Sequence, residues 1–223
     1  MIIKLNYKSL FYALSFLFLL CIICSYFTPS TTAESTDEVP IPVIMYHHIY
    51  DNSKALNDYV ISPAELEEDF KYLNEKGYTA ILPRELLKYT RGEFTLPEKP
   101  VIITFDDGFE SVYHYAYPLA EKYKMKFVMA VFGKETEHFS KINDHNVAYS
   151  YVTWDEIKEL SESGIVEIAN HTYNLHKISE RKGAKIKPGE SQESYAKIFN
   201  EDVSSLQNML TKNSDITPMT FVY

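Results

Sequence analysis

Apolar and polar positions alternate along most of the chain with two different periods. Short apolar runs suit buried strands, and the stretches between them have the spacing of amphipathic helices. The strand-like runs are IPVIMY ending near Tyr46 and residues 79–82, 101–105, 126–132 and 165–169, and TFVY at 220–223 has the character of a sixth. Strands that alternate with helices lie parallel and are joined by crossovers, which predicts an α/β sheet or barrel.

Helix signals fall between these runs. Ser62 and Glu65 have capping-box spacing with Pro63 at the first helical position, and Gly77 would end that helix. Further helices are expected over residues 84–89, from Gly108 to about Tyr123, from the TWDE cap at 153–156 to Gly164, and over 193–210, and residues 133–150 are expected to form a polar loop.

The N-terminal residues 1–33 have a different composition. Lys4 and Lys8 precede the uncharged apolar run 10–27, and small polar residues follow it up to Ala33. This order predicts a secretory signal peptide cleaved after Ala33 or an uncleaved membrane anchor, with the rest of the chain extracellular or at the cell surface. The expected organisation is the leader or anchor over 1–33, a polar linker over 34–41 and one domain over 42–223, which stops on an apolar strand.

Composition and charge narrow the classes of function. A hydrophobic content of 45% and a charged content of 24% are typical of a globular protein with a packed core. The net charge is −9 and every acidic residue follows the leader, so the surface would repel phosphate backbones and nucleic acid is not expected as a partner. Both cysteines, Cys21 and Cys24, lie in the leader, so a metal ion in the exported part must be held by His, Asp or Glu.

Polar residues follow three of the predicted strands. They are YHH at 46–48, the pair Asp106 and Asp107, and NHTYNLH at 170–176. Because the carboxyl ends of parallel strands meet at one edge of a sheet, these side chains should face one mouth. Two histidines and an aspartate with an open position for water are typical of a catalytic metal site. There Asp107 would bind the cation, and Asp106 would remove a proton from water.

Plainer interpretations remain open for each motif taken alone. Asp-Gly is common in turns, His171 could be a hydrogen-bonded loop residue, and His47 and His48 could simply end a strand. The remaining histidines of the domain are interpreted as solvated or packed side chains: His114, His138 and His145. The meeting of three polar motifs at strand ends favours a functional site.

Together, the motifs resemble a known family. TFDDGF at 104–109 resembles the first motif of the polysaccharide deacetylases with NodB homology, and HTYNLH at 171–176 resembles their second motif. MYHHI at 45–49 is similar to the branch that contains the poly-N-acetylglucosamine deacetylases. The resemblance covers about residues 42–223.

This resemblance implies an incomplete (β/α) barrel that lacks its last strands in this chain. It also implies an enzyme that hydrolyses N-acetyl groups of a polysaccharide with one divalent metal ion, most often zinc. Asp106 would be the general base, and Asp107, His171 and His176 would be the metal ligands. Substrate binding or support of the site is assigned to Thr172, Tyr46, His47 and His48. Peptidoglycan, chitin-like oligosaccharides and surface poly-N-acetylglucosamine all remain open as substrates, with MYHHI favouring the last.

Two departures from the family pattern change the expectations. His171 and His176 are five positions apart instead of the usual four, which on a helix would turn the second side chain by about 140° from the first, so the segment must bend. The later motifs of the family, including the histidine that acts as general acid, would lie beyond Tyr223. The chain is therefore expected to release acetate slowly compared with a longer version, by a factor on the order of 10² to 10⁴.

Two rival functions are retained. One is a surface protein on the same fold that binds carbohydrate without turnover, and the other is a non-haem iron oxygenase, whose site also uses two histidines and a carboxylate. The alternation of strands and helices argues against the oxygenase. No HExxH, GxSxG or GxxxxGK[ST] motif is present, so zincin, serine-hydrolase and P-loop functions have no support.

Overall fold

The computed structural model describes residues 39–176 and 181–223. The predicted leader lies outside the described residues, so its cleavage or anchoring stays a prediction. Within the part of the chain that is described, no helix combines the length and the apolar character needed to cross a bilayer. The compact unit Pro40–Tyr223 contains all the elements discussed below.

A parallel sheet forms the centre of this unit, which confirms the predicted α/β class. Its strands, in spatial order, are β1 (Val43–Tyr46), β5 (Pro100–Phe105), β6 (Phe127–Val131) and β7 (Val166–Asn170). Every pairing is parallel, and the short β4 (Thr79–Ala80) pairs with the first residues of β5. Over the described residues the sheet stays open and does not close into a barrel.

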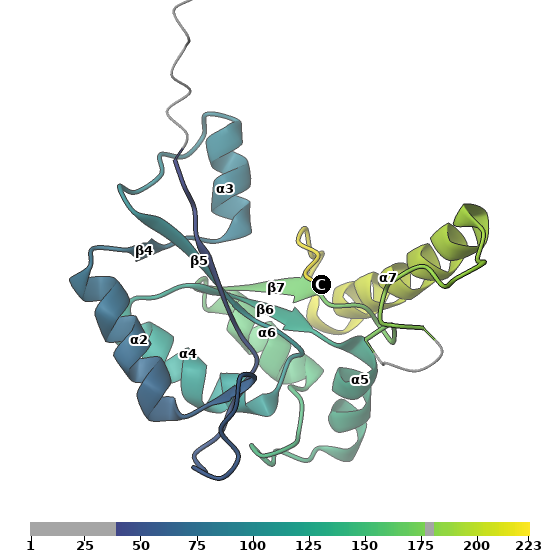
Figure 1. Ribbon diagram of the computed structural model, residues 1–223, viewed down its shortest axis with the longest axis horizontal. Helices are drawn as coiled ribbons and strands as arrows, with labels where there is room; N and C mark the ends of the chain where they lie inside the picture. Colours follow the sequence, from purple (N-terminus) through teal and green to yellow (C-terminus); the bar gives the residue numbers. More distant parts are fainter. Residues whose placement is uncertain (1–38, 177–180) are drawn as a thin grey trace, which may run out of the picture. The chain divides into compact units, whose positions relative to one another are not determined.

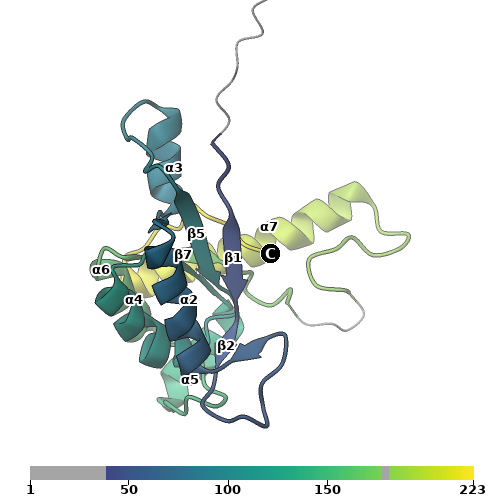
Figure 2. The ribbon, with the colours of Figure 1, turned by 60° about the vertical axis from the view of Figure 1, so that its left-hand side comes forward.

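Side chains of the central strands alternate between two apolar layers. Every residue of β5, β6 and β7 is buried, as expected for a parallel sheet covered on both faces. Ile103 and Phe105 belong to the larger layer, which packs under the helices, and Ile102 belongs to the smaller layer on the opposite face. Figures 1 and 2 show the helices α2, α4 and α6 together on the side of the larger layer.

The helices of the described residues are α2 (Pro63–Glu75), α3 (Pro83–Thr90), α4 (Tyr117–Tyr123, continuing a π-helical segment Val112–Ala116), α5 (Gly133–Ile142), α6 (Trp154–Glu162) and α7 (Gln192–Ser214). Of these, α2 and α6 begin where the sequence places their caps. The Ser62 hydroxyl accepts a hydrogen bond from the Glu65 amide, and the Glu65 carboxylate accepts one from the Ser62 amide. Both capping boxes predicted from the sequence are present.

One expectation about the connections is wrong, and one small sheet was not predicted. Residues 133–150 are not one polar loop, because α5 occupies the first part and buries Thr136 and Phe139. A second small sheet, β2 (His48–Ile49) beside β3 (Val60–Ile61), was not expected. Strands of two residues carry no period that a sequence pattern could reveal.

The end of the described chain starts a further strand beside β7. The Asn170 amide donates to the Thr220 carbonyl at 2.9 Å, and the Val222 amide donates to the Asn170 carbonyl at 3.1 Å. This is a single parallel bridge, formed between Asn170 and Phe221, so the pairing predicted for 220–223 is only begun.

Candidate metal centre

The carboxyl ends of β1, β5 and β7 bring the predicted polar residues to one edge of the sheet. Asp106 follows β5 and its amide donates to the Tyr46 carbonyl at 2.9 Å. His171 follows β7 and its amide donates to the Val131 carbonyl at 3.2 Å. These bonds across neighbouring strands fix where the two segments leave the sheet.

The turn after β5 depends on two residues in the left-handed region. Asp107 has φ 73° and Gly108 has φ 82°, so the chain reverses sharply at the end of the strand. A Cβ atom at Gly108 would lie 3.2 Å from the Cα of Val131, closer than ordinary contact. Asp107 is therefore part of a tight turn, as the plainer interpretation held, and the same turn presents its carboxylate at the mouth.

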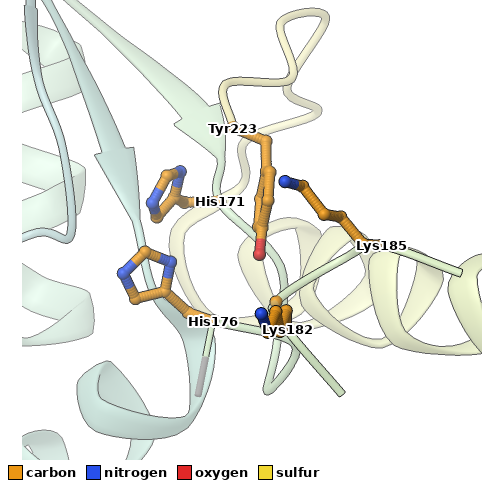
Figure 3. Close-up of a pocket in the computed structure, with 6 residues that line it drawn as sticks. His171, His176, Lys182, Lys185 and Tyr223 are labelled. Carbon is orange, nitrogen blue, oxygen red and sulfur yellow. The ribbon is translucent and has the colours of Figure 1, made fainter. Parts of the chain in front are cut away.

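Three side chains converge there. Asp107 Oδ1 lies 3.1 Å from His176 Nε2 and 3.4 Å from His171 Nε2. The two rings lie 4.8 Å apart between centroids, and Figure 3 shows them side by side. Asp107 Oδ1 and His171 Nε2 are both buried, and neither has a hydrogen-bond partner among the described residues. Buried polar atoms without hydrogen bonds require an explanation, and a bound ion between them is one that these three side chains can provide.

The spacing of these atoms fits a divalent metal ion. Zinc binds imidazole nitrogen and carboxylate oxygen at about 2.0–2.2 Å in tetrahedral geometry, which places two ligand atoms about 3.3–3.5 Å apart. The separations of 3.1 and 3.4 Å from Asp107 Oδ1 lie close to this value. Three protein ligands would leave a position for water or substrate, as in catalytic rather than structural zinc sites.

A backbone carbonyl orients one of the histidines. His171 is 3% exposed, and its Nδ1 donates a hydrogen bond to the Val222 carbonyl at 2.7 Å. That bond places the proton on Nδ1 and leaves the lone pair of Nε2 directed at Asp107. Metal-binding histidines are commonly held in this way by a second partner.

The bend between the two histidines explains their unusual spacing. Thr172 has φ 73°, its amide donates to Asn170 Oδ1 at 2.9 Å, and its hydroxyl accepts from the Leu175 amide at 3.1 Å. The segment is thus a tight turn and not a helix, so both rings reach one carboxylate. Thr172 is fully buried beside the ligand atoms.

Asp202 of α7 holds the same turn and was not identified from the sequence. Its carboxylate accepts hydrogen bonds from the amides of Tyr173 at 2.7 Å and Asn174 at 2.9 Å. It lies far along the chain, on an amphipathic helix whose other acidic residues are solvated. No local pattern marks it as a positioning residue.

The pKa values of the adjacent residues Asp106 and Asp107 are shifted in opposite directions. Burial raises the pKa of Asp106, which is 3% exposed and has an unpartnered Oδ1. Burial also acts to raise the pKa of Asp107, but the neighbouring His171 and His176 outweigh it and lower that pKa. Carboxyl groups whose pKa values diverge in this way are suited to different roles, one as an anionic ligand and one as a proton acceptor.

The pKa values of His171 and His176 are also shifted in opposite directions. Burial acts to lower the pKa of His171, but the contact with Asp107 and the charge of Asp106 outweigh it, so that pKa is raised. Burial lowers the pKa of His176. A neutral His176 beside an anionic Asp107 offers one lone pair and one charge to a cation.

Tyr46 and His48 do not lie with this group, contrary to the sequence-based expectation. The Tyr46 hydroxyl donates to Asp69 Oδ2 on α2 at 2.8 Å, because the alternation along β1 directs this ring under the helices. The His48 ring belongs to the small sheet, where its Nδ1 lies 2.9 Å from the Ser111 hydroxyl. The Tyr46 ring stacks on Phe105, and the His48 ring packs against Phe109.

His47 is the member of the YHH motif that interacts with the aspartates. Its charge contributes to lowering the pKa of both Asp106 and Asp107. The ring packs edge-on against Tyr59 at a centroid distance of 5.2 Å. Of the three residues expected at the end of the first strand, His47 is therefore the one placed near the acidic pair.

A cavity of about 510 Å³ opens beside the two histidines. It is lined by His171, His176, Lys182, Gly183, Lys185 and Tyr223, and Figure 3 shows the Tyr223 ring and the Lys185 side chain across from the histidines. The Tyr223 hydroxyl accepts from the Ala184 amide and donates to the Leu175 carbonyl, which fixes the ring as one wall. Among the described residues, those that line the cavity include two lysines and no carboxylate.

Comparison with known proteins places this arrangement in a family. Two curated relatives are both named poly-beta-1,6-N-acetyl-D-glucosamine N-deacetylase. The protein from Escherichia coli (strain K12) is 30% identical over 162 residues, 68% of this chain and 24% of the relative. The protein from Staphylococcus aureus (strain MSSA476) is 29% identical over 177 residues, 79% of this chain and 57% of the relative. The chain thus spans about a quarter and somewhat more than half of their lengths.

Solved structures and a family model agree with these relatives. A de-N-acetylase from Aggregatibacter actinomycetemcomitans matches with a TM-score of 0.69 at 27% identity, covering 80% of this chain and 76% of that one. IcaB from Ammonifex degensii matches with a TM-score of 0.66 at 28% identity, covering 82% and 73%. The family model described as polysaccharide deacetylase matches residues 94–223, which include the turn after β5 and both histidines. Because this match spans more than half of the chain and agrees with the fold, the chain belongs to the polysaccharide deacetylase family.

Proposed function

We propose that this chain removes N-acetyl groups from an exported polymer of β-1,6-linked N-acetylglucosamine, using a divalent metal ion held by Asp107, His171 and His176. The observation that carries the proposal is the buried Asp107 Oδ1, which faces two imidazole nitrogens without a hydrogen bond to either. The names of the two curated relatives support the choice of polymer. The predicted leader supports an extracellular or surface location.

The chemistry is the hydrolysis of an amide. A divalent cation bound at this site supplies a Lewis acid that polarises the acetyl carbonyl and lowers the pKa of water. Asp106 removes a proton from the attacking water, and its burial favours uptake of that proton. The water oxygen adds to the carbonyl carbon, and the carbon–nitrogen bond breaks as the leaving nitrogen takes up the proton that Asp106 removed, which regenerates the Asp106 carboxylate. Acetate and a free sugar amine are released. Asp107 stays anionic throughout, since the two histidines lower its pKa.

The cavity beside the histidines suits the substrate better than the product. An N-acetylglucosamine unit is neutral, and the Tyr223 ring offers it an apolar wall. The amine that hydrolysis leaves is protonated at neutral pH, and Lys182 and Lys185 on the same cavity would repel it. This repulsion favours release of the deacetylated unit.

The test compares two aspartate variants for acetate release. Asp106→Asn should bind zinc as the unaltered chain does and lose activity by roughly 10² to 10⁴, because its side chain cannot accept the proton. Asp155→Asn is the matched control, since Asp155 is exposed in the first turn of α6. Protein in excess over a poly-N-acetylglucosamine oligosaccharide gives single-turnover conditions, in which slow acetate release is detectable.

Two outcomes would contradict the proposal. Zinc and oligosaccharide binding without any acetate release would favour the rival function, a carbohydrate-binding protein on the same fold. Acetate release by Asp106→Asn at the unaltered rate would remove Asp106 from the mechanism.

A further inference from the structure

A second group of metal-binding side chains lies outside the site described above. Glu110 follows the turn after β5, His145 lies in the connection after α5, and Glu156 lies in the first turn of α6. One oxygen or nitrogen atom from each lies within 4.8 Å of the other two. His145 Nδ1 is 3.1 Å from Glu110 Oε1 and 3.0 Å from Glu156 Oε1.

Two carboxylates are buried together in this group. The side chains of Glu110 and Glu156 are 5% and 11% exposed. Glu110 Oε2 is buried and has no hydrogen-bond partner among the described residues. Burial and the charge of Glu156 raise the pKa of Glu110 to about 7. Two buried carboxylates this close are stabilised either by a proton that one of them keeps or by a positive charge between them.

The geometry around the three side chains can hold a cation, although the contact of 3.1 Å between His145 Nδ1 and Glu110 Oε1 also suits a hydrogen bond from a protonated Nδ1. The Glu156 Oε2 atom accepts from the amide and the hydroxyl of Thr153, both at 2.8 Å, so Oε1 is held toward His145. His145 Nε2 lies 3.3 Å from Asn143 Oδ1, and a proton on Nε2 would bond there and leave the Nδ1 lone pair facing the glutamates. The separations of 3.0 and 3.1 Å lie near the value of about 3.3 Å expected for two ligands of one zinc ion.

The position of the group gives a cation there a structural role. The Glu110 amide donates to the Ser150 carbonyl at 2.9 Å, and the Val152 amide donates to the Gly108 carbonyl at 3.0 Å. The connection that carries His145 is thereby paired with the turn that carries Asp107. An ion bound by all three side chains would fasten this connection to both that turn and α6. The His145 side chain is 42% exposed, which leaves the remaining coordination positions open to water.

We propose that Glu110, His145 and Glu156 form a second binding site for a divalent transition-metal ion such as Zn²⁺. One imidazole with two carboxylates suits such an ion. The competing arrangement is a protonated His145 that bridges the glutamates without a metal. The two arrangements make opposite predictions for the number of ions bound.

The experiment is a zinc-binding measurement on the full chain. Metal is first removed with a chelator, Zn²⁺ is added back, and the bound zinc per chain is measured after equilibrium dialysis at neutral pH. The unaltered chain should bind two zinc ions, His145→Gln one, and Asp107→Asn one. The double variant Asp107→Asn/His145→Gln should bind none. His138→Gln is the matched control, because His138 is an exposed histidine on α5 outside both groups, and it should bind two.

His145→Gln alone decides the matter, because it changes a partly exposed side chain and is expected to fold. Glu110→Gln repeats the test where it folds. A zinc count in His145→Gln equal to that of the unaltered chain would overturn the second site. So would a single zinc ion in the unaltered chain that disappears in Asp107→Asn. Neither result depends on whether the protein hydrolyses acetyl groups, so failure of the second site and failure of the proposed function are distinguishable.

Discussion

Gly108 is the residue on which the turn beside Asp107 depends most. Replacing it with alanine places a side chain at φ 82° and brings a Cβ atom within 3.2 Å of the Val131 Cα. We expect Gly108→Ala to lower the free energy of unfolding by about 1–3 kcal/mol and to weaken zinc binding at Asp107. Urea unfolding with and without zinc measures both effects.

Gly164→Ala is the control for this variant. Gly164 has φ 77°, and no atom lies within 4 Å of the position a Cβ would take. It therefore tests the backbone conformation without the close contact, and we expect a smaller loss of about 1 kcal/mol with unchanged zinc binding. Equal losses in the two variants would show that the approach of Val131 has no energetic consequence.

The pair Glu110 and His145 predicts how stability changes with pH in the absence of metal. The pKa of Glu110 is raised to about 7 in the folded chain, so the folded state holds this proton more tightly than the unfolded state. The contribution of Glu110 to the free energy of unfolding therefore falls as the pH rises from the ordinary pKa of glutamate toward 7. The pKa of His145 is also raised, so its stabilisation is complete below the ordinary histidine value and is lost as pH rises through the raised one.

Both groups make the chelated protein less stable at about pH 8 than at about pH 5. Glu110→Gln removes the glutamate contribution, and its unfolding free energy should change less between these two conditions. Urea unfolding of both proteins with chelator present provides the comparison. An identical pH dependence in the variant would contradict the raised pKa of Glu110.

For single residues, the sequence identifies site candidates by their position directly after predicted strands. Asp106, Asp107 and His171 follow predicted strands, and the structure brings Asp107 and His171 together with His176. Tyr46 illustrates the limit, because the face of a strand end depends on a register that the sequence alone does not set. Asp202 and the group around His145 depend on contacts between distant segments, which no local motif records.

The two halves of the long helix α7 differ in how deeply their side chains are buried. Its buried residues are Leu206, Leu210 and Ser214, all in the second half. Figures 1 and 2 show the first turns extending away from the sheet. We expect amide hydrogens of residues 193–201 to exchange much faster than those of 206–213, because few contacts oppose local opening there. Hydrogen exchange read by mass spectrometry or NMR checks this.

Uniform protection along α7 would contradict that expectation. Leu206→Ala supplies a second comparison, since it removes a fully buried side chain and should cost about 2–5 kcal/mol. Ile198→Ala is its matched control, because Ile198 is 37% exposed on the first half of the same helix.

Elements with strong local signals were predictable, and those without them were not. The helices α2 and α6 begin at capping boxes, where side chains satisfy the free amides of the first turn. The helix α5 begins after Phe132, which has no side-chain cap, and its sequence is largely polar. It forms because Thr136 and Phe139 are buried against the rest of the fold, which is a tertiary effect.

For the whole molecule, metal binding and stability are linked. An ion that binds the folded chain and not the unfolded one stabilises it by about 2.7 kcal/mol at a hundredfold excess over its dissociation constant. We expect zinc to raise the melting temperature of the unaltered chain, and a chelator to reverse the rise. Asp107→Asn should keep a smaller rise from the second group.

Scanning fluorimetry with zinc and then with chelator measures these shifts. A melting temperature that zinc leaves unchanged in the unaltered chain would contradict binding at both groups. The matched control is Asp155→Asn, which should show the full rise.

The sequence predicts the α/β fold class of the whole molecule, but it does not predict the spatial order of the strands in the sheet. Alternating strands and helices predict parallel strands, and every pairing in the sheet is parallel. The adjacency of β1 and β5 in space, with the small sheet and two helices between them in sequence, is not encoded in any local pattern. It follows from how the apolar faces of all the elements fit together.

The hydrogen bond from His171 Nδ1 to the Val222 carbonyl joins the candidate metal centre to the last residues of the described chain. Until those residues have docked beside β7, the imidazole lacks the anchor that aims it. For the proposed ion, we therefore expect capture at full affinity only after residues 220–223 have docked beside β7. The rate of metal binding during refolding would then report when residues 220–223 dock beside β7.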